Sequence, residues 1–209
     1  MTTSLPPDDA VKLLSLQQGQ TLVAIARQTL EAHTGRGKAG KPKTAGWLAE
    51  PRGVFCTLNT HPSGDLRGCV GFPYPDRPLG EAVVAAAISA SRDPRFPPLR
   101  ADELDAVTVE VSVLTVPAEV RVASHADYPV VVRPRIDGLI LRYGPRTGLF
   151  LPQVWDDLPT PEDFLGALCH KAGLARTDAW MDPEARLYQF QAQIFAERTP
   201  KGEVSEVKH

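Results

Sequence analysis

The sequence predicts an α+β fold, in which helices and antiparallel strands follow one another without a regular β-α-β order. Three observations indicate this class. Apolar residues recur at helical spacing in residues 22–30 and 79–91, they alternate with polar residues in 107–116, and two short strand patterns flank a turn between the helices. A doubly wound sheet would need strands and helices to alternate along the chain, so it is disfavoured.

Size and composition are those of a folded chain. The 209 residues are 43% hydrophobic and 23% charged, which is close to globular averages and fits one domain or two closely joined lobes. Twenty prolines are about twice the usual share and indicate many rigid turns. The formal net charge of −2 provides no overall basic field, so nucleic acid and anionic membrane surfaces are disfavoured as partners.

The cellular compartment is expected to be the cytoplasm. No apolar run is long enough to span a bilayer, and the first ten residues carry acidic rather than basic side chains. Three widely spaced cysteines, Cys56, Cys69 and Cys169, suit neither a disulfide framework nor a zinc site. We therefore expect reduced thiols.

The first half of the chain predicts two helices and three strands. The first helix contains Leu22 and Leu30 and ends near His33, where a loop rich in glycine and lysine runs from Thr34 to Lys43. This loop lacks the spacing of a phosphate-binding P-loop, and no strand precedes it. The remaining elements are a hairpin of residues 53–58 and 66–72 with its turn over Pro62, a helix at 79–91, one helical turn at 101–104 and a strand at 107–116.

The second half predicts a β-rich region. Short strand patterns lie at Val130–Val132, Leu139–Tyr143 and Leu149–Leu151, separated by proline or glycine. A helix starts at Pro161 and stops at Gly173, and a last strand runs from Tyr188 to Glu197.

The most informative stretch for function is Leu66-Arg67-Gly68-Cys69-Val70-Gly71. Two glycines weaken a strand unless another group approaches its backbone closely. On a strand Arg67 and Cys69 project from one face, where a guanidinium would favour the reactive thiolate. The alternative is a buried structural cysteine with an arginine that clamps a neighbouring loop.

The register of the hairpin leaves the position of Cys56 open. Pairs whose residue numbers sum to 125 would set Cys56 opposite Cys69, whereas a sum of 124 would set Phe55 there. Opposed thiols could form a redox pair, although two unlinked cysteines are the simpler interpretation in a reducing compartment.

Two further polar residues are candidates for ligand binding. Glu110 lies on the face of its strand that lacks valine and could act as a base or be an ordinary paired acid. Gln153 could orient a ligand through its amide or cap a turn. Asp93 and Arg95 form either an exposed ion pair or a substrate clamp. No metal-ligand spacing is present, and the adjacent Cys169 and His170 point about 100° apart on their helix.

Several ordered blocks of the sequence resemble the AMMECR domain family, whose prokaryotic members are called AmmeMemoRadiSam system protein A. The resemblance covers roughly residues 17–197 of a single domain with two lobes and leaves 1–16 and 198–209 as tails. The blocks are 53–55 with 66–71, 78–82 with 86–89, 93–99, 110–114, 138–140, 148–154, 164–165, 169–174 and 188–195.

This resemblance implies a larger lobe built from both chain ends, with an antiparallel sheet and flanking helices, and a smaller β-rich lobe inserted between them. The family's biochemical activity is not established. Prokaryotic relatives are associated with Memo-like and radical S-adenosylmethionine proteins, which implies a multi-protein pathway. No cofactor is expected.

Two functional hypotheses follow. The first is a binding component of such a pathway, in which Gly68 and Gly71 let a partner strand, peptide or ligand approach the backbone, with Glu110 and Gln153 as binding groups. The second is an enzyme in which Cys69, assisted by Arg67, acts in a cleft between the lobes. Nucleic-acid binding would rest only on the loop from Arg36 to Lys43 and ranks third.

Overall fold

The computed structural model describes residues 13–38, 40 and 44–207 of the chain. The chain divides into two compact units. The first unit holds the chain up to Thr115 and again from Gln193, and the second holds Val116–Ala192. Each unit contains helices and one antiparallel sheet, so the predicted α+β class is confirmed, together with a larger part made from both chain ends and a smaller inserted part.

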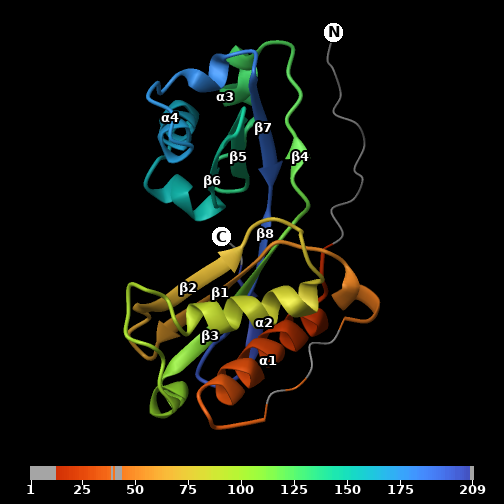
Figure 1. The fold of residues 1–209 in the computed structure, drawn as a ribbon, viewed down its shortest axis with the longest axis vertical. Helices are drawn as coiled ribbons and strands as arrows, with labels where there is room; N and C mark the ends of the chain where they lie inside the picture. Colours follow the sequence, from red (N-terminus) through yellow and green to blue (C-terminus); the bar gives the residue numbers. More distant parts are fainter. Residues whose placement is uncertain (1–12, 39, 41–43, 208–209) are drawn as a thin grey trace. The chain divides into compact units, whose positions relative to one another are not determined.

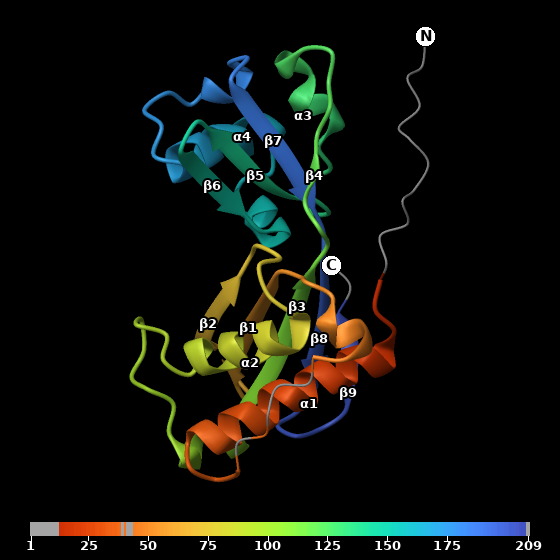
Figure 2. The same cartoon turned by 45° about the vertical axis from the view of Figure 1, so that its right-hand side comes forward.

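The first unit is a five-stranded sheet with two helices on one face (Figures 1 and 2). The strand order is β2-β1-β3-β8-β9, so β2 is an edge strand. Short 3-10 helices, η1 and η2, occupy Gly46–Ala49 and Ala101–Asp105. The main elements are α1 Leu16–His33, β1 Val54–Thr60, β2 Leu66–Phe72, α2 Leu79–Ala90, β3 Val107–Leu114, β8 Ala192–Glu197 and β9 Val204–Val207.

The core of this unit lies between the helices and the sheet. Ser15 and Gln18 form a capping box that starts α1, and Leu22, Ala26 and Leu30 are fully buried on its sheet-facing side. On the strands, the alternate residues that face the helices are buried: Val54, Cys56, Leu58, Val109, Val111 and Val113. The other face of β1 and β3 carries mostly polar side chains.

A buried ion pair joins α1 to β3 and β8. Arg27 on α1 pairs with Glu197 on β8, and it also donates to the carbonyl oxygens of Leu104 and Val107 at 2.8 and 2.7 Å. The Glu197 carboxylate accepts the backbone N–H of Val109 at 3.0 Å. Both charges are thus paired and further satisfied by backbone groups, as burial requires.

The second unit is a four-stranded sheet of order β4-β7-β5-β6, with α4 packed on one face. Trp155 stacks on Phe164 with ring centroids 3.8 Å apart, and its indole N–H donates to the Asp137 carbonyl. Thr160 caps α4. The elements are β4 Ala118–Glu119, η3 His125–Asp127, α3 Tyr128–Val131, β5 Gly138–Tyr143, β6 Arg146–Phe150, η4 Pro152–Asp156, α4 Pro161–Lys171, η5 Ala179–Met181 and β7 Ala185–Phe190.

Three predicted elements differ from the structure. The predicted strand Val130–Val132 is wrong, because Tyr128–Val131 form the short helix α3 and Val130 is 84% exposed. The single strand predicted from Tyr188 to Glu197 is in fact two strands, β7 and β8, which belong to different sheets. Only Gln191 separates them along the chain, so the sequence pattern runs through both. The segment 198–209, expected as a tail, contains β9, which pairs with β8.

Close packing of α2 on β2 explains Gly68. A Cβ atom at Gly68 would lie 2.3 Å from the backbone oxygen of Ala90, the last residue of α2. We expect Gly68→Ala to lower the free energy of unfolding by about 1–2 kcal/mol, because the end of the helix must move. Gly166→Ala on α4 is the control, since its Cβ meets Thr177 at an ordinary 3.4 Å.

Urea denaturation of both variants measures this difference. The control is expected to be neutral or stabilised by up to about 1 kcal/mol, as for a helix-interior glycine replaced by alanine. Equal destabilisation of the two variants would contradict the packing explanation.

Candidate functional site

The hairpin register sets Cys69 opposite Thr57 rather than opposite Cys56 or Phe55. Both registers considered from the sequence are therefore wrong for this part of the hairpin. Near the turn Asn59 lies opposite Leu66, a sum of 125, but a bulge follows and Leu58 lies opposite Gly68. Arg67 is the extra residue of the bulge, and it shifts all later pairs by one.

Three polar side chains form a row across the sheet. Thr57 on β1 lies opposite Cys69 on β2 and opposite Glu110 on β3. The three residues share the sheet face opposite α1 and α2, and all three are partly exposed. The Thr57 hydroxyl donates to the sulfur of Cys69 at 3.4 Å. We call Cys69, Thr57 and Glu110 the polar row.

Cys56 lies on the opposite face of the sheet, inside the helix-covered core. It is fully buried, and burial raises the pKa of the Cys56 thiol, with smaller contributions from Cys69 and Glu110. The two thiols are separated by the sheet, so a redox pair between Cys56 and Cys69 is not formed. Cys56 is a core residue.

The backbone of Cys69 is held by an aspartate-arginine pair from the segment after α2. The N–H of Cys69 donates to the Asp93 carboxylate at 2.9 Å, and Nη2 of Arg95 donates to the Cys69 carbonyl at 3.3 Å. Arg95 also donates to Asp93 at 2.6 Å, and these hydrogen bonds hold the pKa of the Asp93 carboxyl well below its usual range. The pair closes this part of the exposed edge of β2.

The structure gives Asp93 and Arg95 a role that neither sequence interpretation included. The ion-pair interpretation of Asp93 and Arg95 holds for their mutual contact, but Asp93 is 3% exposed and serves the Cys69 backbone. The Asp-Pro-Arg sequence directly after the helix is the available signal. Their hydrogen bonds to the Cys69 backbone, which the sequence does not reveal, place these side chains at the edge of β2.

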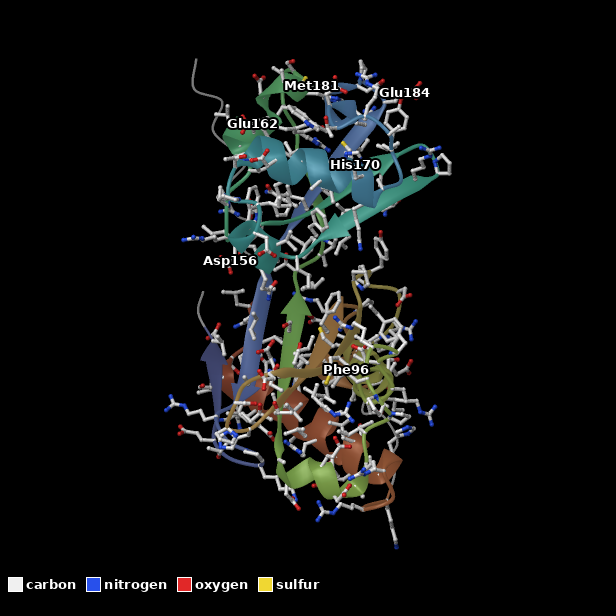
Figure 3. The ribbon with its side chains drawn as sticks, turned by 90° about the vertical axis from the view of Figure 1, so that its left-hand side faces the viewer. Phe96, Asp156, Glu162, His170, Met181 and Glu184 are labelled. Atoms are coloured by element: carbon white, nitrogen blue, oxygen red, sulfur yellow. The ribbon has the colours of Figure 1, made fainter. Side chains whose placement is uncertain are left out.

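Arg67 is engaged away from the thiol. Its guanidinium pairs with Glu103 through two hydrogen bonds of 2.8 and 3.2 Å and donates to the Pro97 carbonyl at 3.0 Å. It also lies 5.9 Å from the centre of the Phe96 ring, which is labelled in Figure 3. The arginine of the motif thus anchors the 96–103 segment to β2, the loop-clamping role considered as the alternative.

Both glycines of the motif are close to atoms of the same chain. Gly68 faces the end of α2, and a Cβ at Gly71 would lie 2.3 Å from the ring of Phe55 and 2.4 Å from the Val54 oxygen. The ring therefore packs directly on the strand where a side chain is missing. These internal contacts account for both glycines without a partner.

The structure brings together some predicted site residues and not others. Cys69 and Glu110 belong to the polar row, and Arg67, Gly68 and Gly71 share strand β2 with Cys69. Gln153 belongs to the second unit, on η4, where it lines a 190 Å³ pocket with Arg135, Pro152 and Asp156, the last labelled in Figure 3. Its side-chain oxygen is buried and has no hydrogen-bond partner among the described residues.

The remaining predicted features lie on α4 and in the basic loop. Cys169 is buried and its neighbour His170 is exposed on α4, so they form no nucleophile-base pair (Figure 3). Residues 39 and 41–43 of the basic loop lie outside the described residues, and Arg36 pairs with Asp105 at 2.8 Å. In the described ranges, no three His, Cys, Asp or Glu side chains are grouped to hold a metal, and no helix is long and apolar enough to cross a membrane.

Burial predicts selective alkylation of the thiols. Under native conditions we expect iodoacetamide to modify Cys69 first, because Cys56 and Cys169 are 0% exposed and react only when the structure opens. Mass spectrometry of peptides should find one labelled cysteine in the native protein and three in denaturant. Labelling of Cys56 as fast as Cys69 would contradict the assigned sheet faces.

The two sheets, with the second inserted into the chain of the first and an Arg-Gly-Cys edge strand, define a class of two-unit α+β proteins. The sequence model of one family, AMMECR1, matches residues 23–195. The chain belongs to the AMMECR1 family, as the sequence resemblance implies.

Relatives and a solved structure extend this assignment. Protein MJ0810 of Methanocaldococcus jannaschii is 43% identical over 95% of this chain and 99% of its own length. A protein of Methanothermobacter thermautotrophicus is 48% identical over 88% of this chain and 96% of its own length. The crystal structure of the uncharacterised protein PH0010 from Pyrococcus horikoshii superposes with a TM-score of 0.80 at 40% identity, covering 92% of this chain and 98% of that one.

Proposed function

We propose that this AMMECR1-family protein is a binding component whose polar row receives a small polar ligand. One observation carries the proposal: Cys69, Thr57 and Glu110 lie in register on the sheet face that the helices of their unit leave uncovered. The row offers a thiol, a hydroxyl and a carboxylate, which can accept or donate hydrogen bonds to hydroxyl, amine or amide groups.

The hydrogen bonds that hold Cys69 in place make the polar row suited to binding. The Asp93–Arg95 pair fixes the Cys69 backbone on one side, and Thr57 bonds the sulfur on the other. A side chain held in this way loses little further conformational entropy when a ligand arrives. Addition of a partner strand at Cys69 is disfavoured, because its N–H and carbonyl groups already have partners.

Capture of a ligand from a cell extract tests the proposal. The protein is equilibrated with the small-molecule fraction, washed and denatured, and the released compounds are identified by mass spectrometry. Thr57→Val and Glu110→Gln should each weaken binding of the captured compound by about fivefold to tenfold, since the first removes a hydroxyl and the second removes the negative charge of a carboxylate acceptor.

Thr21→Val on α1 is the matched control, because its hydroxyl donates within the helix, to Gln17. It should capture the compound like the wild type. Recovery of no compound by the wild type, or equal recovery by all variants, would reject a ligand on the polar row.

An enzyme with Cys69 as an Arg67-assisted thiolate is the weaker candidate. The two hydrogen bonds from Arg67 to Glu103 engage the guanidinium that this mechanism needs beside the thiol. Thiol titration distinguishes the two. Alkylation of Cys69 at neutral pH well above the rate of a model thiol would favour the enzyme.

Partners and compartment also belong to this proposal. We propose that the protein acts in the cytoplasm with Memo-like and radical S-adenosylmethionine proteins, a proposal supported by family membership and by the three cysteines, none in a disulfide. Mixing the purified protein with a purified partner of each kind and measuring co-elution tests it. Separate elution of all three proteins at micromolar concentration would count against a stable complex.

A further inference from the structure

Three exposed arginines lie at the same level of the second sheet. Arg186 on β7 lies directly opposite Arg142 on β5. On the other side, Glu119 of β4 lies opposite Tyr188, and the N–H of Val120 donates to the Leu187 carbonyl at 2.8 Å. If the register that sets Val120 beside Leu187 is continued by one residue, Arg121 lies beside Arg186.

The three arginines concentrate positive charge at one level of the sheet. All three side chains are exposed, and like charges directly opposite each other destabilise a sheet. Arg142 lies over the ring of Tyr188, with its guanidinium carbon 5.0 Å from the ring centre, and this contact holds its positive charge near Arg186. A bound anion would add negative charge beside these arginines, to which only Glu119 contributes within the described groove lining.

Arg186 and Arg121 differ in how many contacts they make within the protein. Arg186 donates to the carbonyl oxygens of Pro183 and Ala185 at 2.6 and 2.9 Å, and its Nε lies 3.6 Å from Glu119. These contacts hold its guanidinium in place. Arg121 has no hydrogen bond or ion pair with the part of the chain that the structure describes.

A groove of about 690 Å³ lies at this end of the sheet, and both Arg121 and Arg186 line it. One wall is the ring of His125, stacked on Tyr128 with centroids 5.0 Å apart and tied by Nδ1 to the Asp182 carbonyl at 2.7 Å. Another part of the lining is apolar: Pro183 and Met181, which is 47% exposed and labelled in Figure 3.

We propose that this groove binds a small anionic metabolite through a phosphate or carboxylate group. Arg121 and Arg186 supply planar, charged donors that suit either group. Met181 and Pro183 contact the apolar part of the ligand. The volume lies within the roughly 300–1,000 Å³ of small-molecule sites, and Glu119 is the one carboxylate among the lining residues. This site is separate from the polar row of the first unit.

Calorimetric titration with pyrophosphate and with citrate tests the proposal on the full chain. Either anion should bind the wild type, and the tighter one shows whether phosphate or carboxylate chemistry is preferred. Arg121→Gln, at an exposed position, should weaken binding by about tenfold or more, because a hydrogen bond to a charged group is lost. Arg186→Gln should do the same.

Arg176→Gln is the matched control. Arg176 is an exposed arginine of the same unit that pairs with Asp178 and does not line the groove. Its removal should change affinity by less than about twofold, which is the screened effect of one charge that does not line the groove. Two results would overturn the proposal: no binding of either anion by the wild type, or equal weakening by Arg176→Gln and Arg121→Gln.

Discussion

Glu197→Ala should lower the free energy of unfolding by about 3–5 kcal/mol. The Glu197 carboxylate is the charged partner of Arg27 and the acceptor of the Val109 N–H. Arg27 is itself 6% exposed, so removal of its partner leaves a buried cation without compensation. Urea denaturation followed by circular dichroism measures the change.

A double variant tests whether the loss of stability comes from a buried unpaired charge rather than from the loss of the Arg27–Glu197 attraction. Arg27→Met with Glu197→Leu removes both charges and should be less destabilised than Glu197→Ala alone, because no unpaired charge stays buried. A double variant that loses as much stability as Glu197→Ala, or more, would contradict this explanation.

Asp93→Ala should lower the free energy of unfolding by about 2–3 kcal/mol, because the Cys69 N–H and the Arg95 guanidinium both lose a charged acceptor. Asp102→Ala is the matched control. Asp102 pairs with Arg100, also two residues away, but both side chains are about 70% exposed. Its removal should lower the free energy of unfolding much less than Asp93→Ala does, because water screens an exposed ion pair.

The difference in the free energy of unfolding between wild type and Asp93→Ala should depend on pH, because the pKa of Asp93 differs between the folded and unfolded states. Hydrogen bonds from Arg95 lower that pKa in the folded state below the unfolded value of about 3.9. The stabilisation is therefore complete at neutral pH and is lost as pH falls below about 4 towards the folded pKa. Wild type and Asp93→Ala should converge in stability in acid. A constant difference down to pH 2 would require another cause.

Local patterns sufficed for most elements of the first unit. The helical spacing of Leu22 and Leu30 and the boundaries of Leu66–Phe72 both correspond to the structure, because each pattern has one strong local solution. The pattern from Tyr188 to Glu197 failed for a physical reason. Alternation of apolar and polar residues indicates which face of a strand is buried, but it does not indicate that β7 and β8 pair in different sheets.

The candidate site depended on register, which the sequence left open. The spacing of Arg67 and Cys69 suggested a guanidinium beside the thiol, but the bulge at Arg67 and the position of Glu103 direct that guanidinium elsewhere. Thr57 carried no signal of its own, because threonine is common on strands. Its place between Cys69 and Glu110 follows only from the pairing of three strands.

Protection of Cys69 by a ligand tests the polar row most directly. The alkylation rate of Cys69 is measured by mass spectrometry in the native protein, with and without the small-molecule fraction of a cell extract, in wild type and in Thr57→Val. We expect the extract to slow labelling of Cys69 in the wild type and to have a smaller effect in Thr57→Val. An unchanged rate in the wild type, under conditions where Cys69 is labelled readily, would contradict it.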